Sequence, residues 1–233
     1  MSISNPCSPA GWTEIVNELV ARNGGGDIAV YLQISRGADS GRDHLMPKRV
    51  TPTVFGLCTR IPDQSENRAG LAAIVVADNR WGRCDIKATA LLANVLLHQQ
   101  AWQANAAEAI LVRDGIVTEG GSSSVIIVEQ GRLITRPNGQ ALLPGTTRQL
   151  ILDLAAQDGM TCSEEEFSEQ RLRAADEIWL MSATRGVVPV CQLDGTAVGN
   201  GKPGPAWQRV VKLFDAYRST LGQARSPNTE THD

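Results

Sequence analysis

The stretch Asp78–Leu92 reads DNRWGRCDIKATALL, and it decides how the rest of the chain is interpreted. It follows the apolar run LAAIVVA at 71–77, which is typical of a buried strand, and it leads into a helical pattern from about residue 88 to 105. Lys87 lies at this strand-to-helix junction with an apolar residue on each side. A lysine in such surroundings loses hydration and becomes a useful nucleophile, able to bond covalently to an aldehyde cofactor. The plainer alternative is a surface lysine whose stem lies on apolar neighbours.

The composition is that of an ordinary soluble globular protein. Of the 233 residues, 42% are hydrophobic and 20% are charged, which is close to average usage. The net charge of −3 provides no basic stripe, so nucleic acid and anionic membrane surfaces are poor partners. No apolar run approaches the ~20 residues that span a bilayer. The N-terminus lacks the basic and apolar regions of a signal peptide.

The cysteines indicate reduced thiols. The chain has five cysteines at wide spacing and no CxxC pair, which argues against a disulfide framework and against a zinc site. With only three histidines, a histidine-rich metal centre is not expected either. We therefore expect a cytoplasmic protein without a metal.

The hydrophobic pattern divides the chain into two lobes and a tail. Ser8 and Pro9 open a helix as N-cap and first-turn residue, and strands follow at 28–35 and 53–58. The polar stretch at 61–67 reads as a linker. The expected division is a small N-terminal lobe at 1–62, a larger lobe at 63–222 and a disordered tail at 223–233.

The larger lobe alternates short strands, tight turns and separate helices. Strands are expected at 108–112, 124–128, 132–135, 177–182 and 187–193, and helices at 147–156 and 207–221. Turns are expected at Asp114–Gly115, Gln130–Gly131 and Asp194–Gly195. This order favours an α+β fold over a doubly wound sheet. In the helix from 88 to 105, the predicted buried face is Leu91, Leu92, Val95 and Leu96, extended by Trp102.

Four segments, in this order, carry a resemblance to a known family. They are YLQISRGADSGRDHLMP (31–47), RWGRCDIKATALLANVL (80–96), VTEGGSSSVIIV (117–128) and LLPGTTRQLILDL (142–154). Together they resemble the fold-type IV pyridoxal-phosphate enzymes, most closely the D-amino acid aminotransferases. The similarity runs from about residue 9 to 214. It implies a two-lobed α+β fold, pyridoxal 5′-phosphate as cofactor, Lys87 as the catalytic residue bonded to it, and a homodimer.

Further residues are candidates for holding the cofactor. Pyridoxal chemistry needs a carboxylate against the ring nitrogen, and Glu119 matches the glutamate that the family places there. The stretch 144–148, PGTTR, precedes a helix and therefore favours an anion, although Thr147 would serve equally well as an ordinary N-cap. Arg83 would otherwise be a solvated surface arginine. The resemblance assigns these cofactor contacts: Arg83, Glu119, Ser122, Ser123, Thr146, Thr147 and Thr184.

The loop after the first strand bears on the substrate. Arg42 and His44 lie two residues apart, so both can point at one carboxylate. In the D-amino acid aminotransferases a similar Arg-x-His pair and an upstream tyrosine bind the substrate α-carboxylate, and Tyr31 matches that tyrosine. In the family this loop reaches the neighbouring subunit's site. Without the resemblance, the pair would read as a polar loop with ordinary ions.

The resemblance also shows a departure. Family members carry several dozen residues ahead of the position at which this chain starts, including an active-site tyrosine and an arginine that clamps the phosphate. We therefore expect a truncated small lobe and weak cofactor retention. The predicted activity is transamination of D-amino acids. The alternatives are a branched-chain aminotransferase or an aminodeoxychorismate lyase of the same fold, or a catalytically silent protein that binds pyridoxal phosphate.

Overall fold

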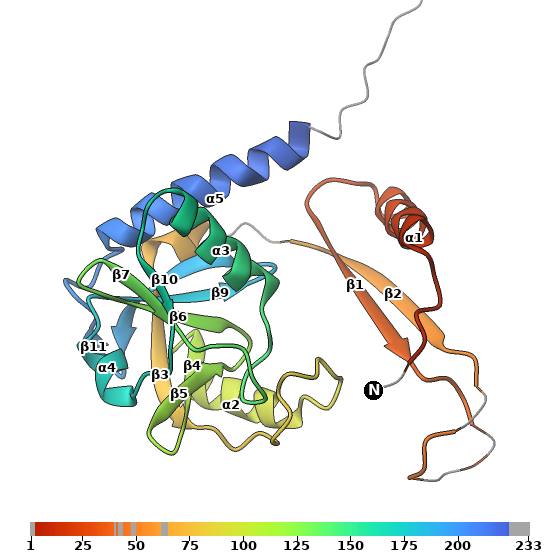
Figure 1. The fold of residues 1–233 in the computed structure, drawn as a ribbon, viewed down its shortest axis with the longest axis horizontal. Coiled ribbons are helices and arrows are strands. Elements are labelled where there is room, and N and C mark those ends of the chain that lie inside the picture. The colour runs from red at the N-terminus through yellow and green to blue at the C-terminus, as the bar shows by residue number, and fades with distance from the viewer. Residues whose placement is uncertain (1–2, 40, 42–43, 48–49, 62–64, 224–233) are drawn as a thin grey trace, which may run out of the picture. The chain divides into compact units, whose positions relative to one another are not determined.

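The computed structural model describes residues 3–39, 41, 44–47, 50–61 and 65–223. It divides into two compact units, Met1–Asp63 and Gln64–Asp233, shown in order along the chain in Figure 1. Residues 224–233 of the predicted tail lie outside the described residues.

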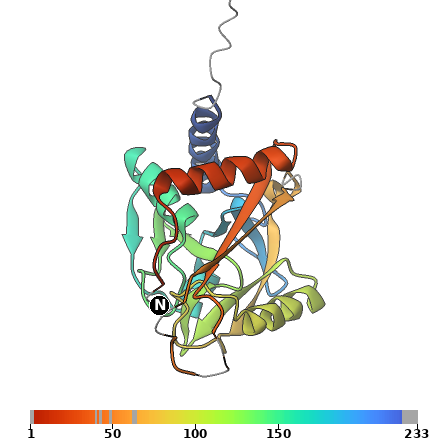
Figure 2. The same ribbon diagram turned by 90° about the vertical axis from the view of Figure 1, so that its right-hand side faces the viewer.

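Unit 1 consists of one helix and one hairpin in its described part. These are α1 (Pro9–Arg22), β1 (Ile28–Ser35) and β2 (Thr53–Arg60). The side chain of Ser8 caps α1 by accepting a hydrogen bond from Gly11 N at 3.1 Å, as its sequence position predicts. α1 crosses the hairpin (Figure 2), and a Cβ on Gly56 would lie only 2.9 Å from Leu19 Cδ1. A glycine at that position therefore allows the helix to pack closely.

Unit 2 is built on a mixed sheet, which has nine strands in the described part of the chain. Its main path runs β5-β4-β3-β10-β9-β6-β7-β8, with β11 paired to β10. β3 runs parallel to both β4 and β10, whereas most other pairs are antiparallel. This confirms the α+β prediction. The elements are η1 (Ser65–Ala69), β3 (Leu71–Ala77), α2 (Leu92–Gln103), β4 (Glu108–Arg113), β5 (Ile116–Gly120), β6 (Ser124–Glu129), β7 (Arg132–Thr135), α3 (Thr146–Gln157), β8 (Cys162–Glu164), α4 (Glu169–Ala174), β9 (Glu177–Ser182), β10 (Gly186–Leu193), β11 (Thr196–Ala197) and α5 (Pro205–Gln223).

Three hairpins close with the same kind of turn. Asp114–Gly115, Gln130–Gly131 and Asp194–Gly195 all have positive φ at both residues, between 48° and 78°. Two consecutive positive φ values define the type I′ turn, whose twist matches that of the flanking strands. The three predicted turns are confirmed.

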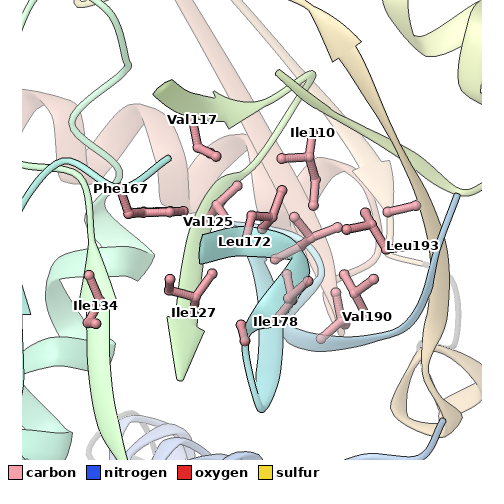
Figure 3. Packing of buried hydrophobic residues seen from close by; sticks show 14 residues of the cluster. Ile110, Val117, Val125, Ile127, Ile134, Phe167, Leu172, Ile178, Val190 and Leu193 are labelled. Carbon is pink, nitrogen blue, oxygen red and sulfur yellow. The ribbon is translucent and has the colours of Figure 1, made fainter. Parts of the chain in front are cut away.

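The core lies on both faces of the sheet. On one face, side chains from seven strands meet Phe167 and Leu172, the latter from α4 (Figure 3). On the other face, Trp179 and Ile126 pack under α3 and α5, which lie side by side away from α2 (Figure 1). Both faces of the central strands are therefore buried, which explains why these strands read as continuous apolar runs.

The predicted start and buried face of the helix after Lys87 are wrong. α2 begins at Leu92 rather than near 88, and Leu97 and Ala101 are the residues it buries. Two polar residues share that face at helical spacing: Asn94 donates to Gly121 O at 2.7 Å, and His98 Nδ1 lies 3.7 Å from Glu108. The stripe that faces the sheet is therefore the less apolar one, and Asn94 is hydrogen-bonded there. The predicted stripe is exposed by 52–72%, and it comprises Leu91, Leu92, Val95, Leu96 and Trp102.

No helix in the described ranges combines the length and the apolar character that crossing a bilayer requires.

Candidate active site

A buried ion pair forms where β3 ends. Arg80 donates from Nε and Nη2 to the two oxygens of Asp78, each at 2.9 Å. Asp78 also accepts from the hydroxyl of Thr118 on β5 at 2.9 Å, and its side chain is fully buried. The backbone N–H of Asp78 donates to Val112 O at 2.8 Å. The first residues of the Lys87 segment are thus fixed to β4 and β5.

Glu119 is the second carboxylate of this cluster. It lies near the end of β5 and is 6% exposed. One of its oxygens accepts a hydrogen bond from Arg80 Nη1 and the other accepts from Leu143 N at 3.1 Å. Burial raises the pKa of Glu119, and the hydrogen bond from Arg80 opposes that rise only in part.

The segment 140–147 connects this cluster to the start of α3. Cys84 N donates to Gln140 O at 2.8 Å, and Arg80 Nη2 donates to Ala141 O at 3.2 Å. After the contact of Leu143 with Glu119, the chain passes so close to β6 that a Cβ on Gly145 would lie 2.5 Å from Ser124 Oγ. α3 begins at the next residue, Thr146. The predicted phosphate loop therefore starts beside the predicted ring contact.

A third buried carboxylate, Glu108, connects the segment at Ser122 and Ser123 with the segment at Thr184. Glu108 is fully buried and accepts hydrogen bonds from Ser122 Oγ at 2.8 Å, Ser123 Oγ at 3.3 Å and Arg185 Nη2. Arg185 also donates to Ser122 Oγ at 2.8 Å. Since Arg185 follows Thr184, this network joins the loop between β5 and β6 to the turn between β9 and β10.

Lys87 itself is exposed. The expectation that its apolar neighbours would remove its hydration is wrong, because the residues from 78 to 91 form turns rather than the predicted junction with a helix. Arg83 is also exposed and pairs with Asp85 at 2.8–2.9 Å. The catalytic role of Lys87 and the cofactor role of Arg83 stay predictions.

The predicted substrate residues belong to unit 1. Tyr31 is 41% exposed and its hydroxyl donates to Gln33 Oε1 at 2.8 Å. His44 is exposed, and Arg42 lies outside the described residues. Their role stays a prediction.

The sequence reading missed four residues of these clusters, namely Asp78, Arg80, Glu108 and Arg185. One signal was available for Glu108, because a carboxylate that opens the apolar run EAILV at 108–112 needs a buried partner. Asp78 and Arg80 directly follow a buried strand, a position where side chains are often fixed by neighbouring strands. Nothing in the sequence singles out Arg185.

An open cavity of about 600 Å³ lies elsewhere in unit 2, lined by residues that include Glu129, Arg132, Thr161 and Asp176. It contains none of the predicted site residues. The candidate site is therefore formed by the clusters around Glu119 and Glu108, and it is identified by the charged groups that meet there rather than by a cavity.

Comparison with known proteins places the chain in a family. The model of the family described as amino-transferase class IV matches residues 1–193. A D-alanine aminotransferase of Bacillus licheniformis is 40% identical over 196 residues, which cover 84% of this chain and 69% of that protein. A D-alanine aminotransferase of Listeria monocytogenes is 37% identical over 212 residues, covering 90% and 73%.

Solved structures share the fold at lower identity. The Escherichia coli branched-chain amino acid aminotransferase has a TM-score of 0.81 at 24% identity, covering 92% of this chain and 73% of that one. A putative 4-amino-4-deoxychorismate lyase from Legionella pneumophila has a TM-score of 0.82 at 19% identity, with 92% and 79% covered. A hypothetical aminotransferase from Mycobacterium tuberculosis, described as the PLP-bound form, has a TM-score of 0.77 at 23% identity, with 90% and 76% covered. From its sequence and its fold, this chain belongs to the class IV aminotransferases, enzymes that depend on pyridoxal phosphate.

Proposed function

We propose that this enzyme transfers the amino group of D-amino acids to 2-oxo acids, as in D-alanine plus 2-oxoglutarate giving pyruvate plus D-glutamate. The identity of 36–40% to several D-alanine aminotransferases supports this substrate class. The structural observation that carries the proposal is Glu119, a buried carboxylate held by Arg80 beside the start of α3. An acidic group and a helix N-terminus side by side suit a ligand with a basic ring and a phosphate.

The start of α3 fits a phosphate. Its N-cap is Gly145, and no side chain of the described residues caps the helix there, so its first N–H groups are available to an anion. Arg148, in the first turn, is 1% exposed. Its two Nη atoms donate to Arg136 O, Asn138 and Glu164, and its Nε has no hydrogen-bond partner in the described part of the chain. Thr146 and Thr147 add hydroxyl donors at this helix start, and Thr184 is exposed in the β9–β10 turn. We infer that the phosphate is held by the first N–H groups of α3 together with Arg148, Thr146, Thr147 and Thr184.

Glu119 fits the ring nitrogen. A carboxylate has about four acceptor positions, and the contacts described above occupy one on each oxygen of Glu119. The remaining positions are available to a protonated ring nitrogen. Ser122 fits less well as a side-chain contact, because its hydroxyl already donates to Glu108. Only its remaining acceptor position or its backbone N–H would meet the cofactor.

The cofactor, when bound, supplies an electron sink for the carbon that loses its proton. In this proposal Lys87 Nζ would hold the cofactor until the amino group of the substrate displaces it. The freed amine of Lys87 would then accept the proton from the substrate Cα and deliver it to C4′ of the cofactor. Its exposure in the turn after β3 leaves the amine accessible. Glu119 keeps the ring nitrogen protonated. Tyr31, Arg42 and His44 bind the α-carboxylate through hydrogen bonds and charge.

We also infer a homodimer. The exposed stripe of α2 presents five large apolar side chains to solvent, and contiguous apolar surface of this kind marks interaction sites. A second copy is the partner that the proposal requires, since the Arg42–His44 loop is expected to serve the neighbouring subunit. The five cysteines are all free thiols, which supports a reducing compartment such as the cytoplasm.

Two experiments test the proposal. In the presence of pyridoxal 5′-phosphate, D-alanine should convert the cofactor to its pyridoxamine form, as followed by visible absorption, whereas L-valine should not. Conversion by L-valine alone would favour a branched-chain aminotransferase, and pyruvate release from aminodeoxychorismate would favour the lyase. Borohydride reduction followed by peptide mapping should place the label on Lys87. A labelled Lys202 or Lys212 instead would contradict the assignment, and a cofactor that binds without turnover would indicate a silent binding protein.

A further inference from the structure

One arginine is shared between two buried carboxylates in the candidate site. Arg80 directs Nε and Nη2 to Asp78 and Nη1 to Glu119, and Nη2 also donates to Ala141 O at 3.2 Å. The side chains of Arg80, Asp78 and Glu119 are 5%, 0% and 8% exposed. A guanidinium is planar and offers donors in a fixed fork, so its position determines the orientation of both carboxylates.

Arg80 makes more hydrogen bonds to Asp78 than to Glu119. Asp78 receives two parallel bonds from the Arg80 side chain, one from Arg80 N at 3.1 Å and one from Thr118, and Arg113 lies 3.2 Å away. Glu119 receives one bond from Arg80 and one from Leu143 N. Burial acts to raise the pKa of both carboxyl groups. The bonds from Arg80 bring the pKa of Asp78 below its ordinary value, whereas the pKa of Glu119 stays above its ordinary value.

This division has a chemical consequence for a carboxylate that must hold a ring proton. A buried carboxylate without a cation takes up a proton and no longer accepts one. When an arginine pairs with one carboxylate alone, its positive charge cancels the charge of that carboxylate. The carboxylate then attracts a second cation only weakly. Sharing Arg80 with Asp78 gives an alternating series of charges that ends in a negative Glu119. Among the described residues, Arg113 and the Cys84 thiol are also in electrostatic contact with this series, and burial raises the pKa of that thiol.

This inference rests on the proposed function, which places Glu119 at the ring nitrogen of the cofactor. We propose that Arg80 is the residue that positions Glu119. Arg80 holds the Glu119 carboxylate ionised and in one orientation, and Asp78 limits how much of the arginine's charge falls on Glu119. Asp78 and Arg80 thereby set how firmly the ring nitrogen keeps its proton.

The first test changes the charge of Asp78 without changing its shape. In Asp78→Asn the charge of Arg80 falls mainly on Glu119, so the bound ring should lose its proton more readily. The probe is pyridoxamine 5′-phosphate labelled with ¹⁵N at the ring nitrogen, whose chemical shift is followed by NMR as a function of pH. The titration midpoint should fall by about one pH unit, a tenfold change in the proton affinity of the ring.

The second test removes the fork of Arg80 but keeps its charge. In Arg80→Lys the ammonium group cannot hold both carboxylates in the same geometry. Affinity for pyridoxamine 5′-phosphate should fall by about 10- to 100-fold, as for loss of a charged hydrogen bond. Affinity for the 1-deaza analogue, in which C–H replaces the ring nitrogen, should change about twofold at most. A merely structural role of Arg80 would weaken both ligands equally.

Glu177→Gln is the matched control, since Glu177 is also a buried carboxylate but bonds Trp179 and the start of α5. It should leave the ring titration unchanged. Equal loss of both ligands in Arg80→Lys, or an unmoved midpoint in Asp78→Asn, would overturn the inference, and Asp78→Asn decides alone if Arg80→Lys does not fold. A separate variant, Glu119→Gln, tests the foundation. If the bound ring titrates at the same pH in Glu119→Gln as in the wild-type protein, the role of Glu119 in the proposed function fails, and the role of Arg80 fails with it.

Discussion

The two units of the chain differ in how they are stabilised. In unit 2 the described residues form three apolar clusters, and side chains such as Phe167 are 2% exposed or less. In the described part of unit 1 every residue keeps partial access to solvent, and Phe55 is 51% exposed. Two-stranded hairpins are marginal on their own. The large unit therefore carries the stability and contains the proposed cofactor residues, while the small unit presents the proposed substrate residues.

The largest expected effect is on catalysis in unit 2. Lys87→Ala should remove transamination altogether, since proton transfer by a positioned side chain alone contributes about 10²- to 10⁴-fold and the covalent hold on the cofactor is lost too. Steady-state rates with D-alanine measure this. Lys212→Ala, an exposed lysine on α5, is the control and should behave as wild type. Residual activity above about one-hundredth would assign the chemistry to another group.

A matched pair of phenylalanines measures the difference in stability. Phe167→Ala in unit 2 should cost about 3–5 kcal/mol in the free energy of unfolding. Phe55→Ala in unit 1 should cost about 1 kcal/mol, chiefly its edge-on contact with Tyr31, whose ring centroid lies 6.4 Å away. Urea unfolding followed by circular dichroism gives both values. Equal costs would show that the two units are packed to the same degree.

The substrate residues of unit 1 should affect binding more than chemistry. Arg42→Ala should weaken the apparent affinity for D-alanine by about 10- to 150-fold, the value of a charged hydrogen bond, with a smaller effect on the rate at saturation. Arg22→Ala is the control, because Arg22 is an exposed arginine of the same unit and pairs with Glu18. An unchanged affinity in Arg42→Ala would remove this loop from the substrate site.

The smallest effects come from two equivalent helix caps, one in each unit. Ser8 Oγ accepts from Gly11 N at 3.1 Å, and Ser168 Oγ accepts from Arg171 N at 3.2 Å. Either serine changed to alanine should cost about 1 kcal/mol. If unit 1 unfolds separately, Ser8→Ala will shift only an early unfolding transition, whereas Ser168→Ala will shift the main one. A single transition shifted by both variants would show that the units unfold together.

Local signals in the sequence predicted most of the fold. The bounds of β1, β7 and β9 coincide with the predicted strands, and the three type I′ turns lie where Gly follows Asp or Gln. β8, α4 and β11 were missed, since each has six residues or fewer and shows little periodicity. The buried face of α2 could not be predicted, because Asn94 on that face is hydrogen-bonded to Gly121 O, which lies 27 residues further along the chain.

In the candidate site too, features with a local sequence signal were predicted, and features that depend on distant residues were not. The start of α3 was predicted because Pro-Gly-Thr-Thr before an apolar periodic segment is visible in the sequence, whereas Glu119 was assigned from the family resemblance. Arg80 and Arg185 were missed, because their bonds to Glu119 and Glu108 connect residues that lie 39 and 77 positions apart along the chain. Exposure of Lys87 was missed because the turns after β3 give no periodic signal.

The close passage of Gly145 against Ser124 has a geometric result. Between Leu143, bonded to Glu119, and Thr146, at the start of α3, the chain advances three residues, which span at most about 11 Å. With Gly145 pressed against β6, this short connection cannot be lengthened. It therefore limits the separation between the contact to Glu119 and the proposed phosphate site at the start of α3. A pyridoxal phosphate analogue with one extra methylene before its phosphate should be too long for this separation and bind more weakly. Equal binding would show that the connection between Leu143 and Thr146 can rearrange.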